Sequence, residues 1–332
     1  MDDNIELGAT PAPVAETLQK KRRRCHGFLG CVLGLSIALL GLAAGRLGNL
    51  WIAFDVFSQF TLQFLFAAVA FTTGMIMPRG KMLIALVLFI GMAVGLSMWP
   101  YYASGHVKTL GTVTDKERAL RIASFNTWYG NQNVDGVKAE IARINADVAV
   151  LIEFGPNKQK IYDALKGQYP YQVKCPNNSD CELGILSKFP LSNSDVEVGW
   201  TGPDFVSASL GADFGGLTIF GIHTTRFPHP RAQFTQIKAM AAKLETVVGP
   251  HIVVGDMNAT PFSRITQTLA TAANLTRLTN LPTWPARLGL PQVAIDHIFA
   301  SPGIRALTSE SIGNNAGSDH FPVFMNLAIP IK

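Results

Sequence analysis

The sequence has few charged residues: Asp, Glu, Lys and Arg make up 15% of its 332 residues. Mean hydropathy is +0.22, which is high for a soluble enzyme, and the apolar excess lies almost entirely before residue 101. No internal repeat or long low-complexity tract is visible, and no long basic stripe interleaved with aromatic residues follows residue 116. The last absence argues against strong binding to duplex nucleic acid. The chain therefore divides into a membrane part and one soluble domain.

Cysteine is also scarce, with four residues in the whole chain. Cys25 and Cys31 lie at or in the first apolar segment, whereas Cys175 and Cys181 bracket the turn-rich sequence PNNSD. This spacing allows a small disulfide-bonded loop, which fits an oxidising compartment; the alternative is two unpaired thiols. Because no second Cys/His pair accompanies them, a zinc site is disfavoured.

Three apolar segments are long enough to cross a bilayer, since each approaches or exceeds the roughly 20 helical residues that this requires. They are Gly27–Gly45, Leu50–Met77 and Met82–Pro100. The alternative for the first segment is a cleaved signal peptide, because a basic run precedes it. The two further segments favour three retained transmembrane helices instead.

The basic residues predict the orientation of these helices. KRRR at 21–24 precedes the first segment, and Arg79 and Lys81 lie between the second and third, while the first loop offers only Arg46. Positive residues stay on the cytoplasmic side, so we expect a multi-pass protein of the cell (inner) membrane with a cytoplasmic N-terminus. We divide it into a tail (1–24), a membrane domain (25–100), a linker (101–116) and an extracytoplasmic, periplasmic domain (117–332).

Three polar residues, Asp55, Gln59 and Gln63, recur at helical spacing in the second apolar segment. Intramembrane carboxylates often mark ion or proton paths. We favour a simpler interpretation, because Asp55 lies near the outward end, where water has access, and both glutamines suit hydrogen bonds between helices.

The soluble domain alternates apolar strand-like runs with helical patterns, which predicts an α/β fold. The expected helices are 134–145, 157–166, 231–248 and 262–273. The expected strands include RIASF, DVAVLI, GILSKFPL, DFVSASLGA, LTIFGI, HIVV and PVFMNLAI.

Polar residues suited to metal or proton binding stand at the ends of these apolar runs. GDMNATPFS follows HIVV and places Asp256 and Asn258 on one face of the strand end, because residues i and i+2 share a face. Other runs end in the same way at Asn126, Glu153 and His223, while Asp296 lies in AIDHIF and the pair Asp319-His320 falls in GSDHFPVF.

This ordered set resembles the endonuclease/exonuclease/phosphatase superfamily, which includes pancreatic deoxyribonuclease, neutral sphingomyelinases and inositol-polyphosphate 5-phosphatases. The resemblance covers roughly Leu120 to Ile329 and includes an Asn, a Glu, a His, G-D-x-N, I-D-x-I and S-D-H in family order. It implies a four-layer sandwich, with two mixed β-sheets packed face to face, helices outside, and an active site where strand ends converge.

Hydrolysis of a phosphate ester requires neutralisation of the phosphoryl oxygens, an activated water and stabilisation of the departing oxygen. The hard oxygen ligands Glu153 and Asn126 suit Mg²⁺ or Mn²⁺ better than zinc. The resemblance implies that Asp319 also lies near the metal. Mg²⁺ (or Mn²⁺) is therefore the expected cofactor.

The resemblance also implies catalytic roles. His320 contacts the scissile phosphate and pairs with the buried Asp296, while Asp256 positions or deprotonates the attacking water. Asn258 orients this water and the phosphate, and His223 donates to a phosphoryl oxygen. His320 is also the natural acid-base group, because a carboxylate neighbour raises the pKa of an imidazole.

Basic and aromatic neighbours leave further alternatives open. Arg226, His229 and Arg231 follow His223 closely, and such cations bind additional phosphates or simply form a solvated helix start. We leave His297 out of the site, because many relatives carry an aromatic residue at this place.

The favoured function is a membrane-anchored phosphodiesterase of nuclease type, acting on nucleic acid. The first alternative is a phospholipid or small-molecule phosphoesterase, similar to a sphingomyelinase or a phosphatase. The second is a membrane protein whose hydrolase domain is inactive, which the intact motif residues oppose. No protein partner is inferred.

Overall fold

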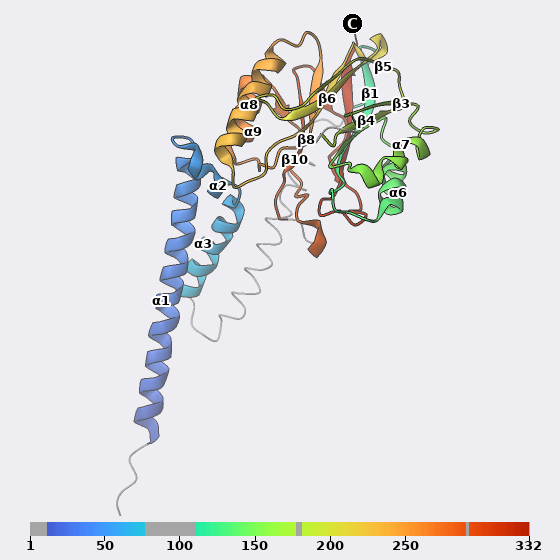
Figure 1. Cartoon of the computed structure of the whole chain (residues 1–332). Helices are drawn as coiled ribbons and strands as arrows, with labels where there is room; N and C mark the ends of the chain where they lie inside the picture. The colour runs from blue at the N-terminus through green and yellow to red at the C-terminus, as the bar shows by residue number, and fades with distance from the viewer. Residues whose placement is uncertain (1–11, 77–110, 177–180, 290–291, 332) are drawn as a thin grey trace, which may run out of the picture. The chain divides into compact units, whose positions relative to one another are not determined.

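The computed structural model describes residues 12–76, 111–176, 181–289 and 292–331 (Figure 1). The chain divides into two compact units. The first comprises Met1–Ala43 and Leu62–Gly95, and the second comprises Ala44–Thr61 and Leu96–Lys332. The catalytic motifs all lie in the second unit, together with a short segment that includes the start of the second apolar stretch.

The first unit contains most of the long helix α1 (Ala12–Leu47) and of helix α3 (Thr61–Ile76). Gly34 and Gly41 of α1 face the rings of Phe71 and Phe64 of α3, at a distance that a Cβ atom would not fit. Small residues allow such close approach of apolar helices. Gly27–Leu47 of α1 is long and apolar enough to cross a membrane.

The three predicted spans have different outcomes. The first coincides with the apolar part of α1. The second, Leu50–Met77, is wrong as one straight helix, because the chain bends by 60° between Ile52–Ser58 and Thr61–Met75. The third, Met82–Pro100, lies outside the described residues, as does most of the predicted linker. Helix α1 begins at Ala12 and so includes part of the predicted tail.

The bend arises within residues 48–60, which we call the connector. It contains a 3₁₀ turn (Ile52–Phe54) and the short helix α2 (Asp55–Ser58). Its polar residues Asp55, Ser58 and Gln59 are buried. Our interpretation of Asp55 as a water-exposed residue at a helix end is therefore wrong.

Two mixed β-sheets form the centre of the second unit, as the sequence predicts. The first has the order β11-β13-β1-β2-β4-β3, with β12 also pairing with β13, and the second has the order β5-β6-β7-β8-β10-β9. The first comprises β1 (Glu117–Asn126), β2 (Val148–Ile152), β3 (Tyr171–Lys174), β4 (Gly184–Ser187), β11 (Arg305–Ala306), β12 (Ser311–Ile312) and β13 (Val323–Pro330). The second comprises β5 (Leu191–Glu197), β6 (Asp204–Leu210), β7 (Thr218–His223), β8 (His251–Asp256), β9 (Thr276–Arg277) and β10 (Asp296–Ala300).

Helices cover the outer faces of both sheets and complete the four layers (Figure 1). Apolar side chains such as Ile122 of β1 and Val254 of β8 form the core between the sheets. A second core lies under α8 (Pro230–Glu245) and α9 (Arg264–Ala272), and a third under α6 (Val134–Ile144) and α7 (Lys160–Ala164). Both faces of the central strands β2, β8 and β10 are thus removed from water, which explains their near-continuous apolar runs.

The predicted strand GILSKFPL is wrong as one element. Its first half is β4 in one sheet, and β5 in the other sheet begins at Leu191. Pro190 separates the two halves and has no N–H to donate to a ladder, so the chain leaves the first sheet there.

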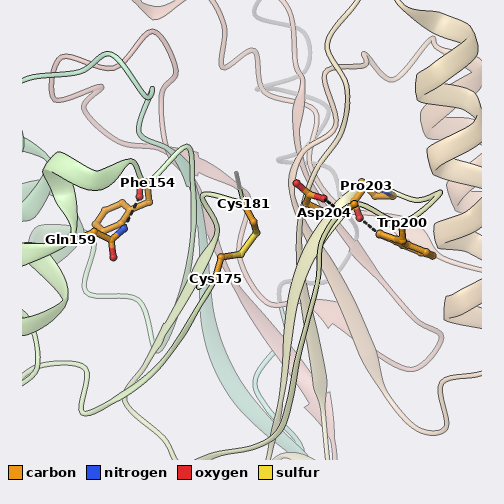
Figure 2. Close-up of a disulfide and its surroundings, with 8 residues drawn as sticks. Phe154, Gln159, Cys175, Cys181, Trp200, Pro203 and Asp204 are labelled. Atoms are coloured by element: carbon orange, nitrogen blue, oxygen red, sulfur yellow. Dashed lines mark hydrogen bonds between the residues drawn. A yellow bond between two sulfur atoms is a disulfide. The ribbon is translucent and has the colours of Figure 1, made fainter. Parts of the chain in front are cut away.

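A disulfide joins Cys175 and Cys181, next to β3 and β4 (Figure 2). Their Cα atoms are 5.7 Å apart, within the usual range. The pairing decides between the two alternatives for these cysteines, and both side chains pack into the core between the sheets.

Candidate active site

The predicted site residues converge because parallel strands bring their carboxyl ends to the same edge. Strand β1 is parallel to β2, and β7 is parallel to β8, where His223 pairs in register with Asp256. Asn126 connects the two sheets: its Nδ2 donates to Glu153 Oε1 and to Asp256 Oδ2, both at 3.0 Å. Residues 130 positions apart in sequence therefore share one hydrogen-bond network.

Glu153 follows β2 in a left-handed conformation, with φ of 50°. Its Oε2 accepts from the backbone N–H of Tyr129 at 2.9 Å. Burial raises the pKa of Glu153, but the nearby His223 imidazole and the hydrogen bonds from Tyr129 and Asn126 outweigh it and lower the pKa overall. The side chain is therefore a carboxylate at neutral pH.

Lys158 binds the loop that contains Glu153, and the sequence did not predict this role. This lysine is fully buried, and its Nζ donates to the carbonyl oxygens of Trp128 at 2.9 Å, Tyr129 at 3.3 Å and Glu153 at 3.4 Å. These carbonyls belong to two loops that meet at the site. The ammonium group thereby fixes the backbone that presents Glu153.

Asp256 and Asn258 form a tight turn at the end of β8. The N–H of Asn258 donates to Asp256 Oδ1 at 2.7 Å, and Asn258 Nδ2 lies 3.2 Å from Nε2 of His223. Burial and the charge of Asp296 raise the pKa of Asp256 above its usual range. The preceding Gly255 has φ of 151°, and a Cβ there would lie 2.0 Å from the carbonyl oxygen of Ile222. Only glycine fits this position.

His320 and Asp296 form a buried pair. Nδ1 of His320 lies 2.8 Å from Asp296 Oδ2, and Nε2 lies 3.7 Å from Asp256 Oδ2. Burial lowers the pKa of the His320 imidazole, but the charges of Asp296 and Asp256 and the hydrogen bond to Asp296 raise it to about 10. The ring is held as an imidazolium in this arrangement.

The S-D-H motif positions His320 through its serine. Ser318 Oγ donates to the Asn126 carbonyl at 2.8 Å and accepts from the N–H of His320 at 3.0 Å. Asp319 accepts from Trp284 Nε1 at 3.3 Å through Oδ2, while its buried Oδ1 has no partner. The sequence motif includes Ser318, but only the folded structure shows that its hydroxyl positions His320.

The arrangement fits a divalent cation. Ligand atoms of Glu153, His223 and Asp256 lie within 4.8 Å of one another, and so do those of Asp256, Asp296 and His320. Several carboxylates thus share a small volume, and buried oxygens of Asp296 and Asp319 lack hydrogen-bond partners. Hard oxygen ligands without a hydrogen-bond partner suit Mg²⁺ or Mn²⁺. Among the described residues Asp319 belongs to neither group, so its ligand role stays a prediction.

The site opens into a cleft of about 650 Å³. Beyond the motif residues, aromatic walls of Trp128, Phe227 and Trp284 line it, together with Arg226 and His229. Arg226 is the one arginine or lysine among the described lining residues. Two of the three predicted extra cations therefore reach the cleft.

Two other basic residues lie elsewhere. Arg231 contacts the ring of Trp51 instead of the cleft, at 6.0 Å from its centroid. His297 is fully buried, with its nitrogens 3.0 Å from the Ala259 carbonyl and 3.3 Å from Thr279 Oγ1. Burial lowers the pKa of His297 to about 3, so this ring is a neutral packing residue, consistent with its omission from the predicted site.

The sequence pattern of the endonuclease/exonuclease/phosphatase family matches residues 123–320, which is more than half of the chain. The chain belongs to this family. The resemblance of its strand-end motifs is thereby confirmed, and a hydrolase of phosphate esters is the corresponding class of enzyme. No curated protein matches the chain at a significant level.

Solved structures show the same fold at low identity. A family member from Bacteroides thetaiotaomicron has a TM-score of 0.52 at 14% identity, over 65% of this chain and 99% of that one. A humanized D. rerio TDP2 has a TM-score of 0.53 at 15% identity, over 63% and 98%. A Staphylococcus aureus beta toxin mutant, whose structure contains bound magnesium ions, has a TM-score of 0.50 at 17% identity, over 64% and 100%.

Proposed function

We propose that this protein is a membrane-anchored, Mg²⁺-dependent (or Mn²⁺-dependent) hydrolase that cleaves phosphodiester bonds outside the cytoplasm. The observation that carries the proposal is the Asp296–His320 pair, with its 2.8 Å contact, beside Asp256 and Glu153 in one cleft. A carboxylate-paired imidazolium next to a buried carboxylate supplies both a donor to phosphate and an acceptor for a water proton.

Glu153 would hold the metal, with Asn126 and Asp319 as further ligands by family resemblance. When bound, such an ion would neutralise charge on the phosphoryl oxygens. His320, held by Asp296, donates from Nε2 to the scissile phosphate. His223, at the exposed edge of the group, donates to another phosphoryl oxygen.

Asp256 accepts the proton of the attacking water in this proposal. Its raised pKa supports that role, because a base works best when its pKa approaches the working pH. Asn258 fixes the water and the phosphate through its amide, which His223 and the Thr224 carbonyl hold in place.

The cleft favours a compact phosphodiester over a long duplex. With Arg226 as its one described arginine or lysine, it offers little charge to neutralise a run of phosphates. Aromatic walls suit an apolar or planar group next to the scissile phosphate. Nuclease specificity therefore stays a prediction that the assay must decide.

The test uses the full chain in detergent or nanodiscs, with bis(p-nitrophenyl) phosphate, p-nitrophenyl phosphate and single-stranded DNA as substrates. We expect diester cleavage that requires Mg²⁺ or Mn²⁺ and that falls by about 10²- to 10⁴-fold in His320→Ala. Asp135→Asn, at an exposed aspartate of α6, is the matched control and should retain full activity. Full activity of His320→Ala would refute the mechanism.

Membrane orientation is tested separately. The basic run at 21–24, before the apolar part of α1, supports a cytoplasmic N-terminus, and three crossings would place the catalytic domain outside. A periplasm-dependent reporter fused after Lys332 should then be active. A reporter that is active only in the cytoplasm would overturn the count of three spans.

A further inference from the structure

The connector between α1 and α3 is docked onto the catalytic domain through a buried aspartate. Asp55 is 2% exposed, and its carboxylate accepts from Ser263 Oγ at 2.5 Å and from the N–H of Arg264 at 2.8 Å. Ser263 is the N-cap of α9, and its Oγ also accepts from Ile265 N. A carboxylate at this place complements the free N–H groups and the positive end of the helix.

A second set of hydrogen bonds extends this contact toward the catalytic turn. Gln59 Oε1 accepts from the N–H of Thr260 at 2.7 Å, and Thr260 Oγ1 lies 3.4 Å from the Ser58 carbonyl. Thr260 is two residues beyond Asn258. The connector therefore binds the same loop that leaves the catalytic turn.

Aromatic contacts link the connector to residues that line the cleft. The ring of Phe60 meets Phe227 edge to face at 6.0 Å, and Phe227 meets Trp284 in the same way at 6.2 Å. Phe227 and Trp284 both line the cleft. Ile52 packs against the core under α8 and α9 on the other side of the contact.

The connector itself is compact. A Cβ at Gly48 would lie 2.9 Å from the Cα of Asp55, and one at Gly45 would lie 3.2 Å from the backbone nitrogen of Ser58. Glycine allows this close approach of backbone segments. Because α1 ends at Leu47 and α3 begins at Thr61, the docked residues adjoin both helix ends.

Several apolar side chains at this junction remain exposed. Leu50 and Trp51 are 83% and 54% exposed, and Phe57 and Phe262 are 38% and 40% exposed. Trp and other large apolar residues beside a membrane helix commonly lie at the bilayer interface. Three of these exposed residues thus occur on the same short segment as the polar contacts, and Phe262 lies next to Ser263, which binds Asp55.

We propose that the connector, docked on the catalytic domain beside the cleft, contacts the bilayer through its exposed apolar side chains, so that the site acts on phosphodiesters of lipid head groups. This inference rests on the proposed function and adds the place and class of the substrate. With the connector docked, its exposed apolar side chains and the cleft belong to one compact unit, so contact of these side chains with a bilayer would bring the cleft to the head groups. An undocked domain would sample many orientations and reach head groups less often.

The experiment uses the full chain reconstituted in vesicles of phosphatidylethanolamine and phosphatidylglycerol, with Mg²⁺. Release of head groups or of phosphorylated head groups is measured beside cleavage of soluble bis(p-nitrophenyl) phosphate. The variants are Asp55→Ala, which removes three hydrogen bonds, and the milder Gln59→Ala. Asp135→Asn is the matched control.

We expect Asp55→Ala and Gln59→Ala to lower lipid cleavage by about tenfold or more while cleavage of the soluble diester is unchanged. If Asp55→Ala lowers the melting temperature so far that the protein is not folded, Gln59→Ala carries the test. Equal losses on both substrates in a folded Gln59→Ala protein would overturn the inference.

Two further outcomes separate the inference from the function beneath it. Cleavage of the soluble diester without any lipid cleavage by the wild type overturns the inference and leaves the proposed function standing. No metal-dependent cleavage of either substrate overturns the proposed function itself. Lipid cleavage that is equal in all variants overturns the role of the connector.

Discussion

The charge on Asp296 is the feature whose removal tests the catalytic pair most sharply. Asp296→Asn keeps the size and one oxygen of the side chain, so the hydrogen bond to His320 Nδ1 persists as a neutral contact. What is lost is the negative charge that stabilises the imidazolium and that also repels Asp256. The substitution therefore changes two ionisable groups in one step.

The expected magnitude follows from that contact. A hydrogen bond to a charged group contributes about 1.5–3 kcal/mol and a neutral one about 0.5–1.5 kcal/mol, so the change costs about 1–1.5 kcal/mol, which corresponds to roughly a 5- to 13-fold decrease in kcat. KM should change less, because the pair acts on the transition state and substrate binding draws on the whole cleft.

The pH profile gives a second and more specific readout. Asp296 raises the pKa of His320, so its removal lowers that pKa and moves the alkaline limb to lower pH. Asp296 also raises the pKa of Asp256, so its removal lowers this pKa as well and moves the acid limb in the same direction. Both limbs should therefore shift to lower pH.

The assay is steady-state cleavage of bis(p-nitrophenyl) phosphate by the full chain across the pH range, with saturating Mg²⁺. Asp135→Asn should leave both limbs in place. Unmoved limbs, or a shift of either limb to higher pH in Asp296→Asn, would refute the assignment of this pair.

Three other predictions concern the metal, the buried lysine and the disulfide. Glu153→Gln should raise the Mg²⁺ concentration for half-maximal activity by about tenfold or more, because it removes a charged ligand; an unchanged Mg²⁺ titration beside Asp135→Asn would contradict this. Lys158→Met should lower the free energy of unfolding by about 1–3 kcal/mol and weaken Mg²⁺ binding, since it removes a charged donor that three carbonyls share. Calorimetry with and without Mg²⁺ measures both, and an unchanged melting temperature counts against it. Replacing Cys175 and Cys181 by Ser should lower the free energy of unfolding by about 2 kcal/mol, because the disulfide closes a loop of six positions. Activity should be retained, because this loop lies outside the cleft. Denaturant titration measures the loss of stability, and a further loss on adding reductant to this variant would disprove the assignment of the disulfide to this pair.

The sequence by itself predicted the strand ends of the catalytic domain, and its motifs resembled a family whose two-sheet layers the structure contains. Strand ends are readable because apolar runs stop at polar residues, and parallel strands bring those ends together. Asp256, Asn258 and Glu153 could thus be placed at one site before any contact was known. The spacing of Cys175 and Cys181 likewise predicted a short loop, although the sequence left open whether the two thiols pair.

Tertiary structure decided what depends on contacts between distant segments. Lys158 gives no local signal, because lysine is usually a surface residue and its buried partners are carbonyls that any sequence supplies. The division of GILSKFPL between two sheets depends on which strand each half pairs with.

Asp55 shows the same limit most clearly. It reads as a polar residue in an apolar segment, yet its partners lie more than 200 positions away, at the start of α9. Hydropathy measures the transfer of a residue from water to lipid and contains no information on a hydrogen-bonding partner elsewhere in the chain. Only the folded chain shows that this carboxylate caps a helix of the catalytic domain.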